Sequence, residues 1–215
     1  MVLLLVTSCS TTRVIKPLEK GEWRIAADAG GPFAANTPIP LTSISAAHGL
    51  TDKVSLFGGL HTSALSFNTL QLDLGANFGL LQPQGWRPGI SANLVINPMV
   101  AFRNGSFRIY PETTVNAYWT VWKKSQIYLG FTQWYDWHLL ETELDKSTFF
   151  HPNLQVGYQY EAKKWVLGAE YKWLNFNKKL LIPQTKVNSI GGYGGYGIYL
   201  KVAYRFNRKE IGDAQ

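Results

Sequence analysis

Hydrophobic and polar residues alternate with a period of two along most of this chain, from Trp23 to Phe206. The alternation is most regular over residues 70–80, where Leu, Ala and Phe share one face and Gln, Asp, Asn and Gly share the other. Successive side chains of an extended chain point to opposite faces. The pattern therefore predicts β-strands with one apolar face and one polar face.

Turn residues interrupt the alternation at intervals that predict ten strands. Asn104-Gly105 is a strong signal for a type I′ hairpin turn, and most other connections are also short. Short connections between consecutive strands favour an antiparallel meander. We predict an all-β fold, a single antiparallel up-and-down barrel of ten strands, with eight as the alternative count. The predicted strands cover residues 23–33, 40–50, 54–65, 70–80, 89–102, 107–121, 126–139, 149–161, 165–176 and 194–206.

The composition favours a barrel that spans a membrane. Only 16% of the residues are charged, against roughly 25% in a typical soluble domain. Aromatic residues make up 14%, and past residue 8 no apolar run is long enough for a transmembrane helix. Strands of membrane barrels dilute their hydrophobicity with polar residues that face the lumen. A soluble β-sandwich or a lipocalin-like barrel is the alternative.

The connections differ in length according to their position. Those after the second, fourth, sixth and eighth strands are tight, whereas the two longest, 140–148 and 177–193, follow the seventh and ninth. Outer-membrane barrels have short turns in the periplasm and long loops outside. This distribution predicts that the tight turns and both termini are periplasmic.

The N-terminus resembles a bacterial lipoprotein signal. A short apolar run ends in Val6-Thr7-Ser8-Cys9, which is similar to a lipobox, and Cys9 is the only cysteine. The resemblance implies acylation of Cys9. Surface-displayed lipoproteins of the Bacteroidota carry an acidic signal after this cysteine, and residues 10–13 contain no acidic residue, which favours the periplasmic leaflet. We predict a signal peptide over 1–8, an acylated linker over 9–22, the barrel over 23–206 and a periplasmic tail over 207–215.

Aromatic residues cluster near the ends of the predicted strands. Such residues form girdles where a membrane barrel meets the lipid–water interface, because the ring is apolar while its N–H or O–H needs water. A sugar-binding face is the alternative. The final strand ends at Phe206 and resembles the terminal strand that the outer-membrane assembly machinery recognises. The predicted girdle consists of Trp119, Trp122, Trp134, Tyr135, Trp137, Trp165, Trp173 and Tyr204.

The polar faces of the predicted strands carry charges of both signs in equal number. A barrel of this size is narrow enough for side chains to fill its interior. Buried charges must pair, because an isolated one is costly. We therefore predict a charge network that plugs the lumen, formed by Arg24, Asp28, Asp73, Arg108, Glu112, Asp136, Glu170, Lys172, Lys201 and Arg205.

The sequence contains no strong catalytic or metal-binding motif. His61, His138 and Asp136 could serve as base and orienting group, with Ser63 or Ser66 as nucleophile, but no nucleophile-elbow pattern is present. The histidines lack metal-ligand spacing. The net charge of +7 comes largely from short basic pairs at turns, which does not favour nucleic-acid binding.

The chain as a whole resembles the small outer-membrane β-barrel proteins, and the resemblance points to those of the Bacteroidota. We predict no cofactor and no metal. The expected partners are outer-membrane lipids and other outer-membrane proteins. The leading hypothesis is a structural or accessory barrel of an envelope complex, with a plugged lumen. A small pore or uptake channel is the second hypothesis, and a lipid-modifying enzyme is the third.

Overall fold

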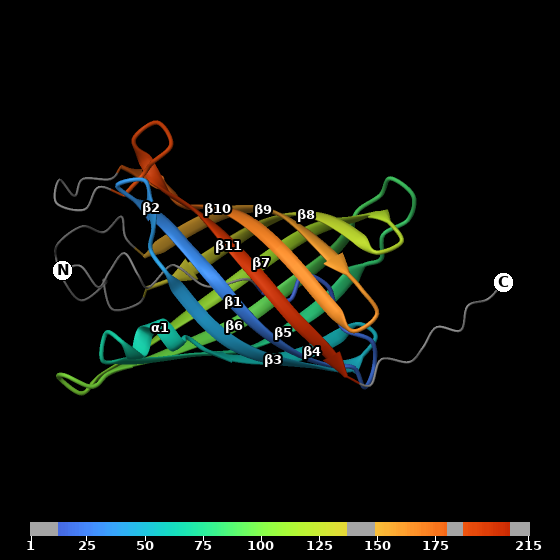
Figure 1. The fold of residues 1–215 in the computed structure, drawn as a ribbon, viewed down its shortest axis with the longest axis horizontal. Helices are drawn as coiled ribbons and strands as arrows, with labels where there is room; N and C mark the ends of the chain where they lie inside the picture. The colour runs from blue at the N-terminus through green and yellow to red at the C-terminus, as the bar shows by residue number, and fades with distance from the viewer. Residues whose placement is uncertain (1–12, 137–148, 180–186, 207–215) are drawn as a thin grey trace.

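A computed structural model describes residues 13–136, 149–179 and 187–206 and shows a closed β-barrel (Figure 1). Ten long strands form the barrel, as the sequence pattern predicts. One two-residue strand and one helical turn lie in the connections. The elements are β1 (Trp23–Ala34), β2 (Thr37–Pro38), β3 (Leu41–Thr51), β4 (Val54–Leu60), α1 (Thr62–Leu65), β5 (Thr69–Leu81), β6 (Gly89–Ala101), β7 (Ser106–Trp122), β8 (Ser125–Tyr135), β9 (Phe150–Glu161), β10 (Trp165–Lys179) and β11 (Tyr193–Phe206).

Each barrel strand pairs antiparallel with the next barrel strand along the chain, and β11 pairs with β1 to close the ring. The closing register runs from Trp23 opposite Phe206 to Pro32 opposite Gly197. Closure leaves none of the ten long strands with an unpaired edge, so their backbone hydrogen bonds are satisfied within the sheet. The up-and-down topology predicted from the short connections is confirmed.

The third predicted strand ends earlier than expected. The strand expected over 54–65 ends at Leu60, and Thr62–Leu65 forms the single turn α1. Turn hydrogen bonds replace the ladder there, with Ala64 N donating to His61 O and Ser66 N to Ser63 O. These local bonds satisfy the backbone without a neighbouring strand.

The two ends of the barrel differ. At one end, here called the turn end, tight connections join β3 to β4, β5 to β6, β7 to β8 and β9 to β10. Trp23 and Phe206 also lie there. The opposite end, the loop end, carries α1 and β2 together with the last residues of β8 and β10 (Figure 1). The predicted grouping of connections is therefore present, with the start of β1 and the end of β11 at the turn end.

The barrel is apolar outside and polar inside, the reverse of a soluble protein. Outward side chains such as Leu74 and Leu94 are about half exposed (50% and 53%), whereas lumen residues such as Asn77 and Asn93 are fully buried (0%). The charged residues of the described strands lie on the lumen side, apart from Lys178 and Lys179 at the loop end of β10. Within the described residues, no helix has the length and hydrophobicity needed to cross a membrane.

Candidate functional site

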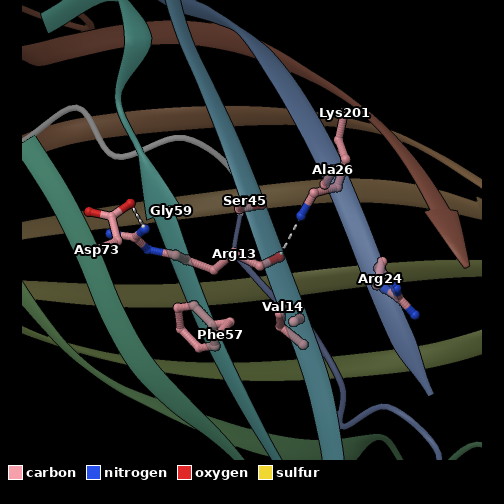
Figure 2. Close-up of a pocket in the computed structure, with 10 residues that line it drawn as sticks. Arg13, Val14, Arg24, Ala26, Ser45, Phe57, Gly59, Asp73 and Lys201 are labelled. Carbon is pink, nitrogen blue, oxygen red and sulfur yellow. Dashed lines mark hydrogen bonds and ion pairs between the residues drawn. The ribbon is translucent and has the colours of Figure 1, made fainter. Parts of the chain in front are cut away.

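The lumen is the candidate site, and the chain's own residues 13–22 fill it. This segment, here called the plug, lies inside the ring of strands (Figure 2). Arg13 contacts residues in the half of β5 nearer the loop end, and Gly21 pairs with Gly49 at the turn end before β1 begins. The sequence predicts a linker here, and the structure shows that the described part of it is packed inside the barrel.

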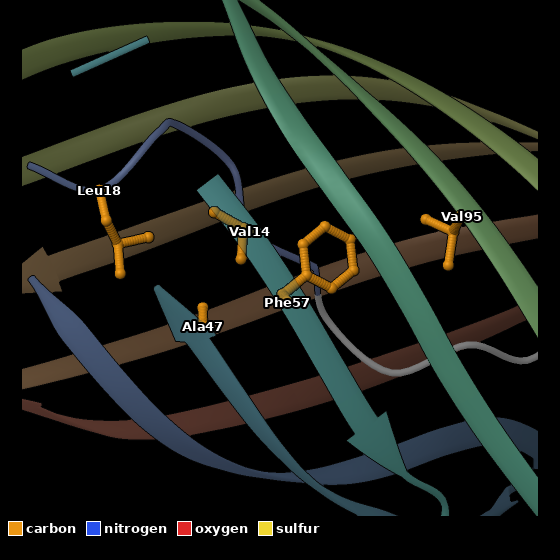
Figure 3. Close-up of a cluster of buried hydrophobic side chains, with 5 residues drawn as sticks. All are labelled: Val14, Leu18, Ala47, Phe57 and Val95. Atoms are coloured by element: carbon orange, nitrogen blue, oxygen red, sulfur yellow. The ribbon is translucent and has the colours of Figure 1, made fainter. Parts of the chain in front are cut away.

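Apolar side chains anchor one side of the plug. Val14 and Leu18 cluster with Ala47, Phe57 and Val95 of the wall (Figure 3). Leu18 is 1% exposed. These contacts bury hydrophobic surface within an otherwise polar lumen, which stabilises the plugged state.

Polar wall side chains satisfy the plug backbone. Asn77 and Asn93 each donate a hydrogen bond from Nδ2 to the carbonyl of Val14, at 3.2 and 3.1 Å. The Ser91 hydroxyl donates to the carbonyl of Ile15, and Leu18 N donates to the hydroxyl of Ser55 at 2.7 Å. Buried backbone groups need partners, and here the wall side chains supply them.

The Arg13 guanidinium is the most extensively bonded group of the plug. Its Nε and Nη2 donate to the two carboxylate oxygens of Glu112 at 3.1 and 2.6 Å. Nη1 donates to Asp73 Oδ2 at 2.5 Å, and Nη2 also donates to Asn97 Oδ1 at 3.0 Å. His61 Nε2 lies 2.7 Å from the same Asp73 oxygen. We refer to Asp73, Glu112, Asn97 and His61 as the acidic wall site.

Burial and neighbouring carboxylates shift the pKa values of two basic side chains of the plug, Arg13 and Lys16. Burial alone lowers the pKa of the Arg13 guanidinium, but Asp73 and Glu112 outweigh it and raise this pKa above its ordinary value. Burial lowers the pKa of the Lys16 ammonium, and Glu161 offsets this only in part. The plug therefore contributes a permanent cation to the acidic wall site.

A second charge cluster closes the lumen near the turn end. Arg205 contacts Glu161 at 2.5 Å and Glu22 at 3.3 Å. Arg24 also lies 3.3 Å from Glu22, and Lys16 lies 3.1 Å from Glu161. The plug supplies Lys16 and Glu22 to this cluster, and each of them pairs with an oppositely charged side chain of the wall.

A third cluster lies on the wall formed by β8, β10 and β11. Glu170 accepts a hydrogen bond from the Tyr128 hydroxyl at 2.8 Å and contacts Lys172 at 3.0 Å. The Lys172 ammonium lies 4.8 Å from the centre of the Tyr199 ring. Gly157 accommodates Tyr128, because a Cβ there would lie about 2.1 Å from the ring.

Of the remaining predicted lumen charges, Lys201 contacts the plug directly. Lys201 donates to the carbonyl of Arg13 at 3.1 Å and lies 3.9 Å from Asp28. Arg108 is half-buried, 3.4 Å from the hydroxyl of Tyr110, and Asp136 is buried near the loop end. The structure thus brings the predicted charges into one lumen, distributed over several clusters.

Sequence reasoning missed four charged residues of the lumen: Arg13, Lys16, Glu22 and Glu161. The first three belong to the segment predicted as a linker, whose alternating charges carry no strand period. Glu161 could have been found, because it continues the lumen-facing alternation of Gln155 and Gln159 on β9. These residues add two cations and two anions, so the predicted balance of charge is retained.

One predicted girdle residue is wrongly placed. Trp134 is 2% exposed and packs against Met99 and Tyr110 inside the barrel. The alternation along β8 explains this, because Tyr128 and Thr132, at even-numbered positions like Trp134, are also buried. Its side chain therefore points away from any lipid.

The other girdle residues in the described ranges fall at the two ends of the barrel. Trp137 lies outside these ranges. The interval from Trp165 to Trp173 corresponds to about 26 Å along the strand, or about 20 Å along the axis at a tilt of about 40°. That height suits the apolar band of a membrane barrel. Turn-end residues are Trp119, Trp122, Trp165 and Tyr204, and loop-end residues are Tyr135 and Trp173.

The catalytic alternative receives little support from the geometry. His61 lies against Asp73, which Arg13 occupies, and the hydroxyl of Ser63 accepts a hydrogen bond from Thr42 N at 3.1 Å. His138 lies outside the described residues. Among the residues that the structure places, no three His, Cys, Asp or Glu side chains gather as metal ligands.

A small cavity remains beside the plug. Its volume is about 20 Å³, which is room for roughly one water molecule. Arg13, Asp73 and Lys201 line it together with neighbouring wall residues (Figure 2). This cavity is too small to hold a solute larger than water.

A closed ring of strands, an uncharged apolar belt between aromatic ends and a polar lumen together define a transmembrane β-barrel. The chain matches no known family model and no curated protein. Among solved structures, it is similar to an outer-membrane channel from Pseudomonas putida F1, with 9% identity, 92% of this chain and 100% of that chain covered, and a TM-score of 0.48.

Two further solved structures are similar to a comparable degree. The translocator domain of the autotransporter NalP from Neisseria meningitidis is 11% identical over 89% of this chain and 91% of that one, with a TM-score of 0.45. The N-terminal β-barrel domain of Pseudomonas aeruginosa OprF is 14% identical over 88% and 100%, with a TM-score of 0.36. These TM-scores lie below 0.5, so what these proteins do is not carried over to this chain.

Proposed function

We propose that this chain is an outer-membrane β-barrel whose lumen is closed by its own N-terminal segment, and that it acts as a structural or accessory subunit of the cell envelope. The observation that carries this proposal is the plug. Residues 13–22 fill the lumen with apolar packing, backbone hydrogen bonds and paired charges. A barrel closed in this way has no open path for a solute. Its lipid-facing exterior and its loops are then the surfaces through which it would contact other molecules.

Conductance in planar lipid bilayers tests the closed lumen. We expect the purified full chain to give no stable single-channel steps. The matched control is a chain of equal length in which residues 13–19 are replaced by Gly and Ser, which removes both the apolar anchor and Arg13. This control is expected to conduct. Stable steps from the unsubstituted chain would overturn the plugged state and favour the pore alternative.

Co-purification tests the accessory role. We expect extraction from native membranes in mild detergent to yield the barrel together with a second envelope protein in a fixed ratio. A chain with an outward substitution such as Ile96→Glu, on the exposed face of β6, serves to map the contact. Recovery of the barrel as a monomer under every mild extraction condition would contradict the accessory role.

Acylation of Cys9 is part of the proposal. Cys9 lies outside the described residues, but four peptide units hold its Cα within about 14 Å of that of Arg13. Because Arg13 lies in the loop-end half of the lumen, an acyl chain on Cys9 would tether the plug near the loop end, rather than in the periplasmic leaflet that residues 10–13 favour. Metabolic labelling with a radioactive fatty acid tests this, with Cys9→Ser as the control. Equal labelling of both chains, or none in either, would contradict acylation at this position.

The turn end is proposed to face the periplasm, because outer-membrane barrels have short turns on that side. Labelling of intact cells with a membrane-impermeant maleimide tests the orientation. Asn104→Cys, in a loop-end turn, should react, and Lys163→Cys, in a turn-end connection, should not. The unsubstituted chain gives the background from Cys9, and the opposite pattern would reverse the orientation.

A further inference from the structure

Among the described residues of the strands, no lysine or arginine forms an ion pair with Asp73 or Glu112 of the acidic wall site. Asp73 on β5 and Glu112 on β7 are both buried, and their guanidinium partner comes from the plug. Two buried carboxylates so near to one cation are costly once that cation leaves. The wall is therefore built to receive a cation at this point.

Wall contacts hold the site in shape independently of the plug. Asn97 Nδ2 donates to the carbonyl of Tyr110 at 2.9 Å and lies 3.3 Å from Glu112 Oε2. His61 Nε2 bonds Asp73 Oδ2, while Asp73 Oδ1 is buried with no hydrogen-bond partner among the described residues. The acceptors are thus positioned by the barrel, and one of them is still unused.

The geometry selects a guanidinium rather than an ammonium group. Arg13 uses Nε and Nη2 against both oxygens of Glu112, Nη1 against Asp73, and Nη2 also against Asn97. A planar fork of donors fits this arrangement, whereas an ammonium is a compact charge that cannot span both carboxylates in the same way. The acceptor oxygens of Glu112, Asp73 and Asn97 therefore lie in the directions of the N–H donors of one planar guanidinium group.

We propose that Asp73, Glu112, Asn97 and His61 form a guanidinium-binding site in the barrel wall. Arg13 fills it in the plugged state, and the same site binds a guanidinium-bearing ligand, such as an arginine side chain, when Arg13 is absent. This proposal rests on the plugged lumen described above. It adds that the acidic wall site binds a guanidinium group specifically.

Chemical rescue of Arg13→Ala in the full chain tests the proposal. This substitution removes the part of the side chain that N-ethylguanidinium reproduces. The readout is the temperature at which half of the folded band is lost on a cold electrophoresis gel. We expect N-ethylguanidinium to raise this temperature by about 3–6 °C at ten times its Kd. Ethylammonium at the same concentration should give a much smaller shift.

Two controls separate site binding from a general salt effect. The unsubstituted chain should show no shift, because Arg13 occupies its site. The double variant Arg13→Ala/Glu112→Gln should show none either, because half of the acceptor set is gone. An equal response to ethylammonium, or an equal response of the double variant, would overturn the guanidinium site.

If Arg13→Ala is too unstable to isolate, the yield of refolding replaces the melting temperature as the measurement. The urea-unfolded variant is diluted into detergent with and without N-ethylguanidinium, and the yield of folded band is compared. A higher yield with this ligand alone supports the site, and an unchanged yield overturns it. The bilayer experiment on the unsubstituted chain is independent of both outcomes, so failure of the site is distinguishable from failure of the plug.

Discussion

Replacing Arg13 by Met tests whether the plug is held by charge as well as by packing. Met is unbranched and of similar length, so it keeps much of the apolar contact while removing the guanidinium. Asp73 and Glu112 would then lose their shared cation inside the barrel. We expect the variant to fold into the same barrel with a clearly lower free energy of unfolding.

The size of the effect follows from burial. The side chains of Arg13, Asp73 and Glu112 are exposed by 5%, 4% and 0%, so solvent screens these ion pairs little. Removing one partner of such a buried pair costs about 3–5 kcal/mol, because the remaining charge is left uncompensated. Replacing all the charged partners together is often close to neutral. The triple variant Arg13→Met/Asp73→Asn/Glu112→Gln should therefore recover most of the loss.

Urea unfolding in detergent micelles, followed by tryptophan fluorescence, measures these free energies. Lys20→Met is the matched control, because Lys20 belongs to the same segment but is exposed. We expect it to change stability by less than about 0.5 kcal/mol. A loss of under about 1 kcal/mol for Arg13→Met, or a triple variant as unstable as the single one, would refute the reasoning.

Two further predictions concern the wall and the exterior. Gly157→Ala should cost about 1–3 kcal/mol in the same unfolding assay, because its Cβ would overlap the Tyr128 ring. Gly168→Ala, whose Cβ would meet its nearest neighbour at 3.5 Å, should be nearly neutral, and equal effects would contradict the packing argument. On the outer face of β5, Leu74→Arg should cost about 2–4 kcal/mol in lipid vesicles, and Leu80→Arg, closer to the turn end, about 0–1 kcal/mol. A similar cost at both depths would argue against a membrane-embedded exterior.

Because the plug is part of the same chain, charged residues of the lumen wall bind the protein's own N-terminal segment. The lysines and arginines of the described strands form no ion pair with Asp73 or Glu112, and Arg13 of the plug pairs with both carboxylates. Stability of the closed state therefore depends on the N-terminal segment as well as on the strands. Any event that withdraws this segment would expose the acidic wall site at the same time as the lumen.

The sequence by itself determined the barrel and most of its two faces. Alternation with a period of two is a local property of an extended chain, so Leu74 outside and Asn77 inside can be assigned from residue order alone. The same rule placed Asp73, Glu112, Glu170 and the other lumen charges on the inner face. The same alternation places Trp134, two residues before the buried Asp136, on the inner face as well.

Only the tertiary structure decided which lumen groups meet. Arg13 reaches Asp73 and Glu112 across separations of 60 and 99 residues. These pairings depend on the register and closure of the whole ring, and on a segment without strand periodicity folding back into the lumen. Periodicity reports the face on which a side chain lies. It does not say which side chains face one another across the lumen, because those contacts depend on the register and closure of all ten strands.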